Sequence, residues 1–185
     1  MTEGFWTYQD QESRTAINMN LILPYIVKNG IWWTLPPLLF SLGLMAVAPT
    51  ALTPTEFNVG IPNILLLGEM IGRVIVFAMP LFFTIGLVTK GQKIGFCLYI
   101  FGVAAYCLTY GIQNYFPDSP WSTSMIGFSA SAYTNLFWMV GLGLMGQKFY
   151  PPIRLVYRPI FYITLSVVFI ILHVTHLVMY FQLNF

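Results

Sequence analysis

Charged side chains are scarce in this 185-residue chain: Asp, Glu, Lys and Arg together make up 8% of it. Soluble domains carry about 25% charged residues. A surface in contact with water cannot be built from so few charges, so a soluble globular protein is excluded. Disorder is excluded too, because disordered chains are poor in aromatic residues and this chain is 17% aromatic. With 57% hydrophobic residues, the composition predicts a protein that crosses a membrane several times.

Clustered basic residues and closely spaced cysteines are also lacking. The formal net charge of +2 is too small to favour nucleic-acid binding, which needs a clustered basic face. The two cysteines, Cys97 and Cys107, lie ten residues apart. That spacing is about 15 Å along a helix, too far for a disulfide. No repeat of fixed period is found, which argues against the inverted repeats of many transporters. We therefore expect one integral membrane domain over residues 1–185.

Long apolar runs, by contrast, are abundant. A helix that crosses a bilayer takes about 17–25 mostly apolar residues. Five stretches qualify: 31–48, 63–88, 94–115, 126–145 and 159–181. The sequence thus predicts an all-α, polytopic transmembrane bundle of five spanning helices, preceded by a cytoplasmic or interfacial segment over residues 1–29.

The first of these spans has two interpretations. Pro36 and Pro37 lie inside it, and proline removes a main-chain donor and tends to kink a helix. The alternative is an interfacial helix over residues 14–29, with the span beginning near Trp32 and Trp33. Ala46-Val47-Ala48 is similar to a signal-peptide cleavage site, but the apolar run before it begins some thirty residues into the chain. A retained first span is therefore expected.

The positions of the basic residues predict the orientation. Seven of the eight Lys and Arg residues precede the first span or lie in the connections after the second and fourth spans. The connections 49–62 and 116–125 contain no Lys or Arg. Short loops rich in Lys and Arg stay on the cytoplasmic side. We expect a multi-pass protein of the cytoplasmic (inner) membrane, with the N-terminus inside and the C-terminus outside.

Four ionisable residues lie within the predicted spans: Glu69 and Arg73 in the second, and His173 and His176 in the fifth. A charged side chain at the centre of a membrane helix costs about 2.5–3.5 kcal/mol on insertion scales. At about 1.5 Å per residue, all four fall at overlapping depths in the outer half of the membrane. Each pair also shares one face of its helix, being four and three residues apart. We expect the two pairs to meet in the bundle.

Polar side chains of the third and fourth spans lie at the same level, whereas the inner halves of these spans are hydrocarbon and glycine. This pattern predicts a polar pocket that opens outward and binds or passes a small amphiphilic or anionic ligand. Arg73 would supply a fixed charge, and the two histidines a pH-sensitive element. The predicted ligand-binding residues are Glu69, Arg73, His173 and His176, with Tyr110, Gln113 and Asn135 as neighbours.

Three other interpretations stay open. Glu69 and Arg73 are also typical of a structural ion pair, with the histidines joining two helices by hydrogen bonds. A membrane-embedded hydrolase or transferase could use Glu/His acid–base or metal chemistry. The chain could instead be a non-catalytic subunit of a larger membrane complex. His173 and His176 do not have the spacing of the zinc-protease motif, and they share one helix face, which disfavours bis-histidine haem. No metal ligand, catalytic residue or cofactor is assigned, and the expected partners are membrane lipids, the ligand and, in the last interpretation, partner membrane subunits.

Overall fold

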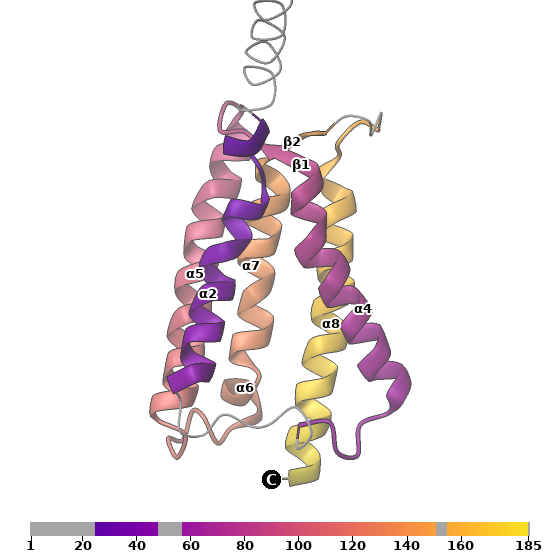
Figure 1. The fold of residues 1–185 in the computed structure, drawn as a ribbon. Helices are drawn as coiled ribbons and strands as arrows, with labels where there is room; N and C mark the ends of the chain where they lie inside the picture. The colour runs from indigo at the N-terminus through magenta and orange to yellow at the C-terminus, as the bar shows by residue number, and fades with distance from the viewer. Residues whose placement is uncertain (1–24, 48–56, 151–154, 185) are drawn as a thin grey trace, which may run out of the picture.

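The computed structural model describes residues 25–47, 57–150 and 155–184, and most of these are helical (Figure 1). The elements follow one another as α2 (Ile31–Val47), α4 (Asn63–Ala78), the 3-10 helix η1 (Met79–Phe82), β1 (Phe83–Ile85), α5 (Lys90–Tyr115), α6 (Met125–Phe128), α7 (Ala130–Met145), β2 (Gly146–Phe149) and α8 (Pro159–Asn184). Most of the predicted N-terminal segment, including residues 14–24 of the alternative interfacial helix, lies outside the described residues, as does Ala48.

The mainly helical class that the sequence predicts is confirmed. A helix occupies each of the five predicted stretches. Within the described ranges, three segments are long and apolar enough to cross a membrane: Asn63–Phe82, Lys90–Tyr115 and Pro159–Asn184. The first helix is a shorter apolar one, and α7 has 16 residues. Crossing of the membrane by α2 and α7 therefore stays a prediction.

The second predicted span, 63–88, is wrong at its end. Helix α4 stops at Ala78, and the chain continues as η1 and then as strand β1. Pro80 explains the stop, because proline has no main-chain N–H and its ring clashes with the carbonyl four residues earlier in an α-helix. The predicted fourth span is also divided, since α6 and α7 are separated at Ser129. The third begins earlier than predicted, where Thr89 and Gln92 form a capping box at the start of α5.

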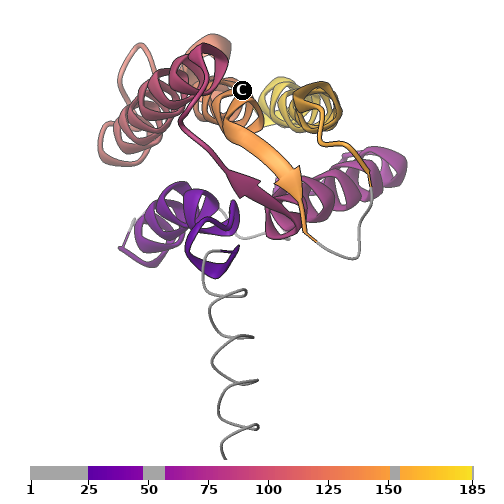
Figure 2. The ribbon, with the colours of Figure 1, turned by 90° about the horizontal axis from the view of Figure 1, so that it is seen from above.

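A small antiparallel sheet closes one end of the bundle. Strand β1 pairs with β2, and all three residues of β1 are buried. The chain before α2 joins the same strand, because Gly30 donates its N–H to Phe83 O and Ile85 donates its N–H to Lys28 O. Tyr157, which precedes α8, packs on Phe83 of β1 and donates its hydroxyl to Gly143 O over 2.8 Å. Burial raises the pKa of this tyrosine, which keeps the hydroxyl protonated. Figure 2 shows the two strands lying across this end of the helices.

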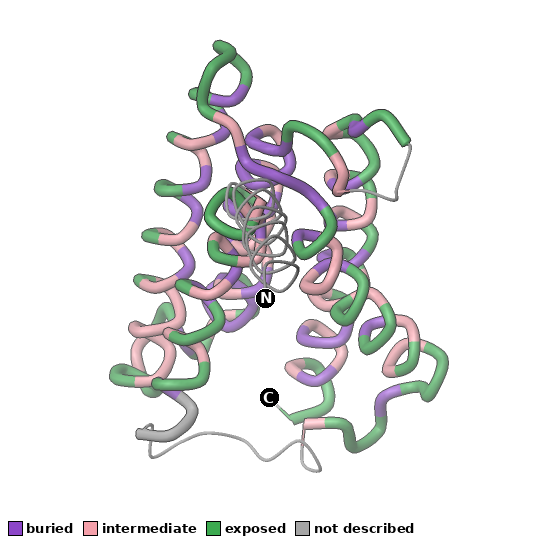
Figure 3. Tube along the Cα trace, turned by 45° about the horizontal axis from the view of Figure 1, so that its top comes forward, coloured by how far each residue is buried: buried purple, intermediate pink, exposed green. Residues whose placement is uncertain are grey.

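The five longer helices form an open arc in the order α2, α5, α7, α8, α4 (Figure 2). Helices that follow one another along the chain run in opposite directions, so that α2, α5 and α8 begin near the sheet while α4 and α7 end at it (Figure 1). Figure 3 shows that burial is unequal along the arc. Helix α7 has nine buried residues, whereas Glu69 and Val76 are the two buried residues of α4. The ends of the arc, α2 and α4, diverge away from the sheet (Figure 1).

Glycines bring neighbouring helices into close contact. A Cβ at Gly141 of α7 would lie 2.5 Å from Tyr99 N and 2.6 Å from Gly95 O of α5, so these two helices touch through their main chains. On the other side of the arc, a Cβ added at Gly68 or Gly72 of α4 would lie 3.4 Å from Leu172 or Phe169 of α8, an ordinary van der Waals distance. Small residues at these positions let α4 approach α8 closely.

Replacing Gly102 by Ala should destabilise the α5–α7 pair. The new methyl group would overlap Trp138 N and lie 2.7 Å from Phe137 C, and main-chain atoms cannot rotate away. Overpacking of this kind costs about 1–3 kcal/mol of the free energy of unfolding. Thermal unfolding of the purified protein in detergent, followed by circular dichroism, measures the loss.

Gly111→Ala is the matched control on the same helix. Nothing lies within 4 Å of the position a Cβ would take there, and alanine favours helix over glycine by up to about 1 kcal/mol. Equal unfolding temperatures for the two variants would contradict the close α5–α7 contact.

Candidate functional site

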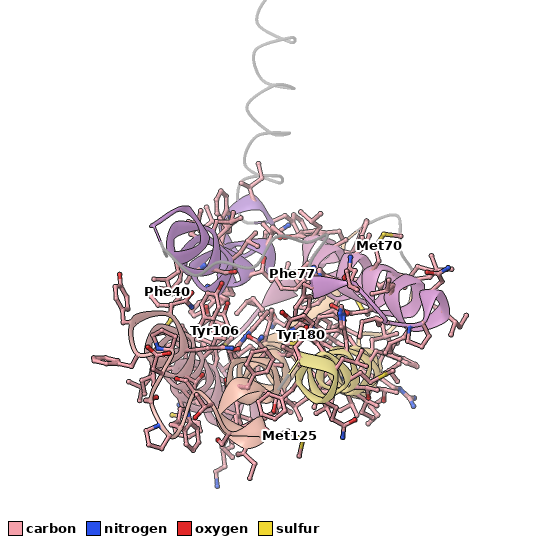
Figure 4. The ribbon with its side chains drawn as sticks, turned by 90° about the horizontal axis from the view of Figure 1, so that it is seen from below. Phe40, Met70, Phe77, Tyr106, Met125 and Tyr180 are labelled. Carbon is pink, nitrogen blue, oxygen red and sulfur yellow. The ribbon has the colours of Figure 1, made fainter. Side chains whose placement is uncertain are left out.

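A cavity of about 1190 Å³ lies inside the arc of helices. Residues of α2, α4, α5, α7 and α8 line it, together with Phe57, Phe128 and parts of the connection after α5. Figure 4 looks into the bundle from below, with Phe77, Tyr106 and Tyr180 toward its middle. The lining includes all seven residues singled out from the sequence: Glu69, Arg73, Tyr110, Gln113, Asn135, His173 and His176. All seven residues therefore line the same cavity, and their role in ligand binding stays a prediction.

The carboxylate of Glu69 is the centre of the polar cluster. It is 4% exposed. Its Oε1 atom accepts hydrogen bonds from Arg73 Nη2 and from His173 Nδ1, the latter over 3.0 Å. Its Oε2 atom lies 2.5 Å from His176 Nδ1. The ionisable groups of the second and fifth predicted spans therefore meet, as the cost of burying them alone requires.

Local packing explains why Glu69 reaches α8. Gly68 precedes it and Gly72 lies one turn later, and both face α8 across van der Waals contacts. The short distance between the helices puts the carboxylate against two imidazoles that share one face of α8. An added Cβ at either glycine would already be in van der Waals contact with α8, so a side chain longer than that of alanine would press against Leu172 or Phe169.

Arg73 belongs partly to the cluster and partly to the cavity. Its side chain is 55% exposed, compared with 5% for the side chain of Glu69. A guanidinium has five N–H donors, and the contact with Glu69 involves one nitrogen, Nη2. Because Arg73 lines the cavity, its exposed donors are available to a ligand there.

The two histidines have different surroundings. His176 is 2% exposed, and its Nε2 atom lies 3.0 Å from the main-chain oxygen of Phe57, so both ring nitrogens face oxygen atoms. The ring of Phe57 also packs on it, with centroids 4.3 Å apart. His173 has a side chain 20% exposed and lies parallel to the ring of Phe169, with centroids 5.6 Å apart. Of the two, His173 is the one more open to the cavity.

A second set of polar groups comes from α5 and α7. Trp138 donates its Nε1–H to Asn135 Oδ1 over 2.7 Å. Since the indole nitrogen is a donor alone, the amide oxygen of Asn135 must face it, and the NH₂ group is turned elsewhere. Ser131 donates to Gln113 Oε1 over 3.3 Å, and Tyr110 stacks on Tyr106. This wall therefore offers amide N–H donors to the cavity.

Exposed apolar side chains border the cavity where α2 and α4 diverge. Those on the cavity lining are Leu38 and Leu42 from α2, and Leu67, Met70 and Val74 from α4. At the opposite end, the sheet and the aromatic core around Phe83, Tyr157 and Tyr162 fill the bundle. Among the described residues, the side between α2 and α4 is thus bordered by exposed apolar side chains.

Two members of this site were missed by the sequence analysis. Phe57 contributes a main-chain carbonyl, which any residue carries, so no residue type could have identified it. Trp138 orients Asn135, and the spacing of three residues on one helix was the available signal.

Among the residues that the structure describes, no group of three or more His, Cys, Asp or Glu is arranged to hold a metal ion. Comparisons of the chain with protein-family models, with curated proteins and with solved structures find no match. The geometry of the cavity is therefore the basis for inferring a function.

Glu69→Ala should destabilise the protein strongly. The change removes the acceptor of three donors and leaves the buried His176 without its carboxylate. A buried polar group left without its partner costs about 1–3 kcal/mol. The unfolding temperature in detergent measures this cost.

Asp118→Ala, in the exposed connection after α5, is the control, since surface substitutions change stability by about 0.5 kcal/mol or less. If both variants unfold at the same temperature, the Glu69 cluster does not hold α4 to α8.

Proposed function

We propose that the cavity binds an amphiphile with an anionic head group, which enters from the bilayer between α2 and α4. The observation that carries this proposal is the exposed guanidinium of Arg73 on the lining of a large, mostly apolar cavity. The ligand's anionic group would pair with Arg73, and its apolar chain would lie along the exposed leucines of α2 and α4.

The depth of Arg73 supports an anionic ligand. Arg73 is ten residues into α4, about 15 Å from the start of the helix. In a hydrocarbon layer about 30 Å thick, that is the inner limit of the outer half. Glu69 is shared by Arg73 and two histidines, and its contact with Arg73 involves one guanidinium nitrogen. An anion on the exposed side of Arg73 would accept hydrogen bonds from the other nitrogens.

The size and lining of the cavity support an amphiphile. Pockets for small ligands are about 300–1,000 Å³ in volume, and this cavity is larger, at about 1190 Å³. Its lining combines the charged cluster of α4 and α8 and the amides of α5 and α7 with leucines, valine and aromatic rings. A head group and an apolar chain would each find matching surroundings.

The proposal includes an orientation in the membrane. Of the six described Lys and Arg residues, Lys28, Lys90, Lys93, Lys148 and Arg158 lie at or next to the end closed by the sheet. The preference of basic residues for the cytoplasmic side puts this closed end inside. With α2, α4, α5, α7 and α8 all crossing the cytoplasmic membrane, the cavity opens toward the outside and the C-terminus is external.

A second candidate, an acid–base enzyme acting on a lipid, is favoured by one observation. His173 contacts Glu69 through Nδ1, the arrangement in which a carboxylate orients an imidazole for proton transfer. His176 does not fit this role, because Phe57 O occupies its second nitrogen. Hydrolysis of a lipid ester that is lost in His173→Gln would favour the enzyme over the binding protein.

Arg73→Gln should weaken binding of an anionic amphiphile. The probe is a fluorescent alkyl sulfonate, offered to the protein in nanodiscs of neutral phospholipid. A hydrogen bond to a charged group contributes about 1.5–3 kcal/mol, so the dissociation constant should rise by roughly ten- to a hundredfold.

Lys93→Gln, which removes an exposed cation at the sheet end, is the matched control and should bind like the unmodified protein. The proposal would be wrong if Arg73→Gln bound the sulfonate as tightly as the unmodified protein does. It would also be wrong if the unmodified protein bound the alkyl alcohol of the same chain length as tightly as the sulfonate.

Met70→Trp should slow entry of the same probe from the bilayer. Met70 is exposed and lines the cavity on the α4 side, so a larger ring there narrows the passage between α2 and α4. Stopped-flow fluorescence measures the entry rate.

Ile64→Trp adds the same ring to an exposed position of α4 that is not part of the lining. Equal entry rates for the two variants would show that the ligand does not pass between α2 and α4.

A further inference from the structure

His176 has an oxygen atom beside each of its ring nitrogens: Glu69 Oε2 at 2.5 Å from Nδ1 and Phe57 O at 3.0 Å from Nε2. A main-chain carbonyl only accepts hydrogen bonds, so Nε2 must carry a hydrogen. A neutral imidazole has one N–H and one lone pair, which would leave the lone pair of Nδ1 facing Glu69. Two acceptors do not approach to 2.5 Å, so a further proton must lie between Nδ1 and Oε2.

We propose that Glu69 and His176 form an intramembrane proton-binding site, which holds one proton between the imidazole and the carboxylate. The proton is on Nδ1, giving an imidazolium beside a carboxylate, or on Oε2, giving a carboxylic acid beside a neutral imidazole. Both forms contain the same number of protons and satisfy the same two hydrogen bonds. In water at pH 8, a free histidine is neutral and a free glutamate is a carboxylate, so neither holds an extra proton.

Other groups around the pair define its electrostatic surroundings. On α4, Arg73 donates to the other carboxylate oxygen, Oε1, and on α8 His173 does the same. Tyr180 of α8 packs on Phe57, and Tyr106 and Tyr110 of α5 line the same cavity. The lining also includes Phe128 of α6, Asn135 of α7 and Phe57 of the connection before α4, and none of these three side chains titrates. Among the described lining residues, Arg73 is thus the permanent positive charge, and Oε2 is left to His176.

His173 provides an internal comparison. It also contacts Glu69 through Nδ1, at 3.0 Å, but the described contacts place no acceptor beside its Nε2. A neutral His173 with its hydrogen on Nδ1 satisfies that contact without an extra proton. The two histidines lie one turn apart on α8. In the described contacts, they differ in the acceptor beside Nε2, which is the feature that requires the extra proton at His176.

Retention of the proton has a consequence that rests on the proposed function. With the proton, the cluster of Arg73, Glu69 and His176 carries a net positive charge, and without it the cluster is neutral. An anion should therefore bind more tightly to the protonated protein. By linkage, affinity should fall by up to about tenfold per pH unit above the pH at which the proton is lost.

The first experiment detects the proton itself, without any ligand. The full chain, labelled with ¹⁵N-histidine in nanodiscs, is studied at pH 8 by nitrogen NMR and by infrared spectroscopy. We expect one histidine with both nitrogens protonated, or else the C=O band of a carboxylic acid that Glu69→Gln removes. The signal should vanish in His176→Gln and persist in His173→Gln. A bare nitrogen on every histidine, together with no carboxylic acid band, would overturn the proposal.

Glu69→Gln is chosen because it should fold. Its amide can donate to Nδ1 of a neutral His176, which keeps its hydrogen bond to Phe57 O. The measurement on the unmodified protein needs no variant at all, so a variant that fails to fold does not decide the result.

The second experiment tests the linkage with the fluorescent alkyl sulfonate, whose charge does not change with pH. Affinity should fall with rising pH in the unmodified protein and in His173→Gln, and should be independent of pH in Glu69→Gln. A detected proton together with no binding would reject the proposed function and leave the proton site standing. Binding that is independent of pH in the unmodified protein would reject the linkage.

Discussion

The carboxylate of Glu69 joins α4 to α8 by hydrogen bonds at the wall of the cavity. Helix α4 has two buried residues, and one of them is this acid. Its oxygens receive Arg73 from the same helix and two histidines from α8. Because a charged group buried in apolar surroundings is costly unless it is paired, each partner lowers the free-energy cost of burying the others.

The two ends of the bundle are built from different interactions. Strands β1 and β2, the chain before α2 and several aromatic rings fill the sheet end, where main-chain hydrogen bonds join segments far apart in the sequence. Away from the sheet, α2 and α4 diverge, and side chains of five helices surround a cavity instead of filling the space. Tight α5–α7 contact through glycines gives this cavity one rigid wall. The other wall, α4, is held mainly by α8.

The sequence allowed the meeting of α4 and α8 to be predicted, because an isolated charge in hydrocarbon is costly and two pairs lay at overlapping depths. Helical spacing also placed Tyr110, Gln113 and Asn135 at the level of the cluster, and all three line the cavity. The end of the second span was wrong because a continuous apolar run is compatible with helix, 3-10 turn and buried strand. The contact of His176 with Phe57 O could not be predicted, since every residue has a carbonyl.

By itself, the sequence determined a mainly helical chain and the presence of ionisable groups that need partners, since both follow from composition and helical spacing. Tertiary structure decided which helices are neighbours, that α2 and α4 border an opening, and that His176 has acceptors on both sides while His173 does not. These features depend on how helices approach one another in space. His173 and His176, which follow Glu69 by 104 and 107 positions in the sequence, are brought to its carboxylate by that packing.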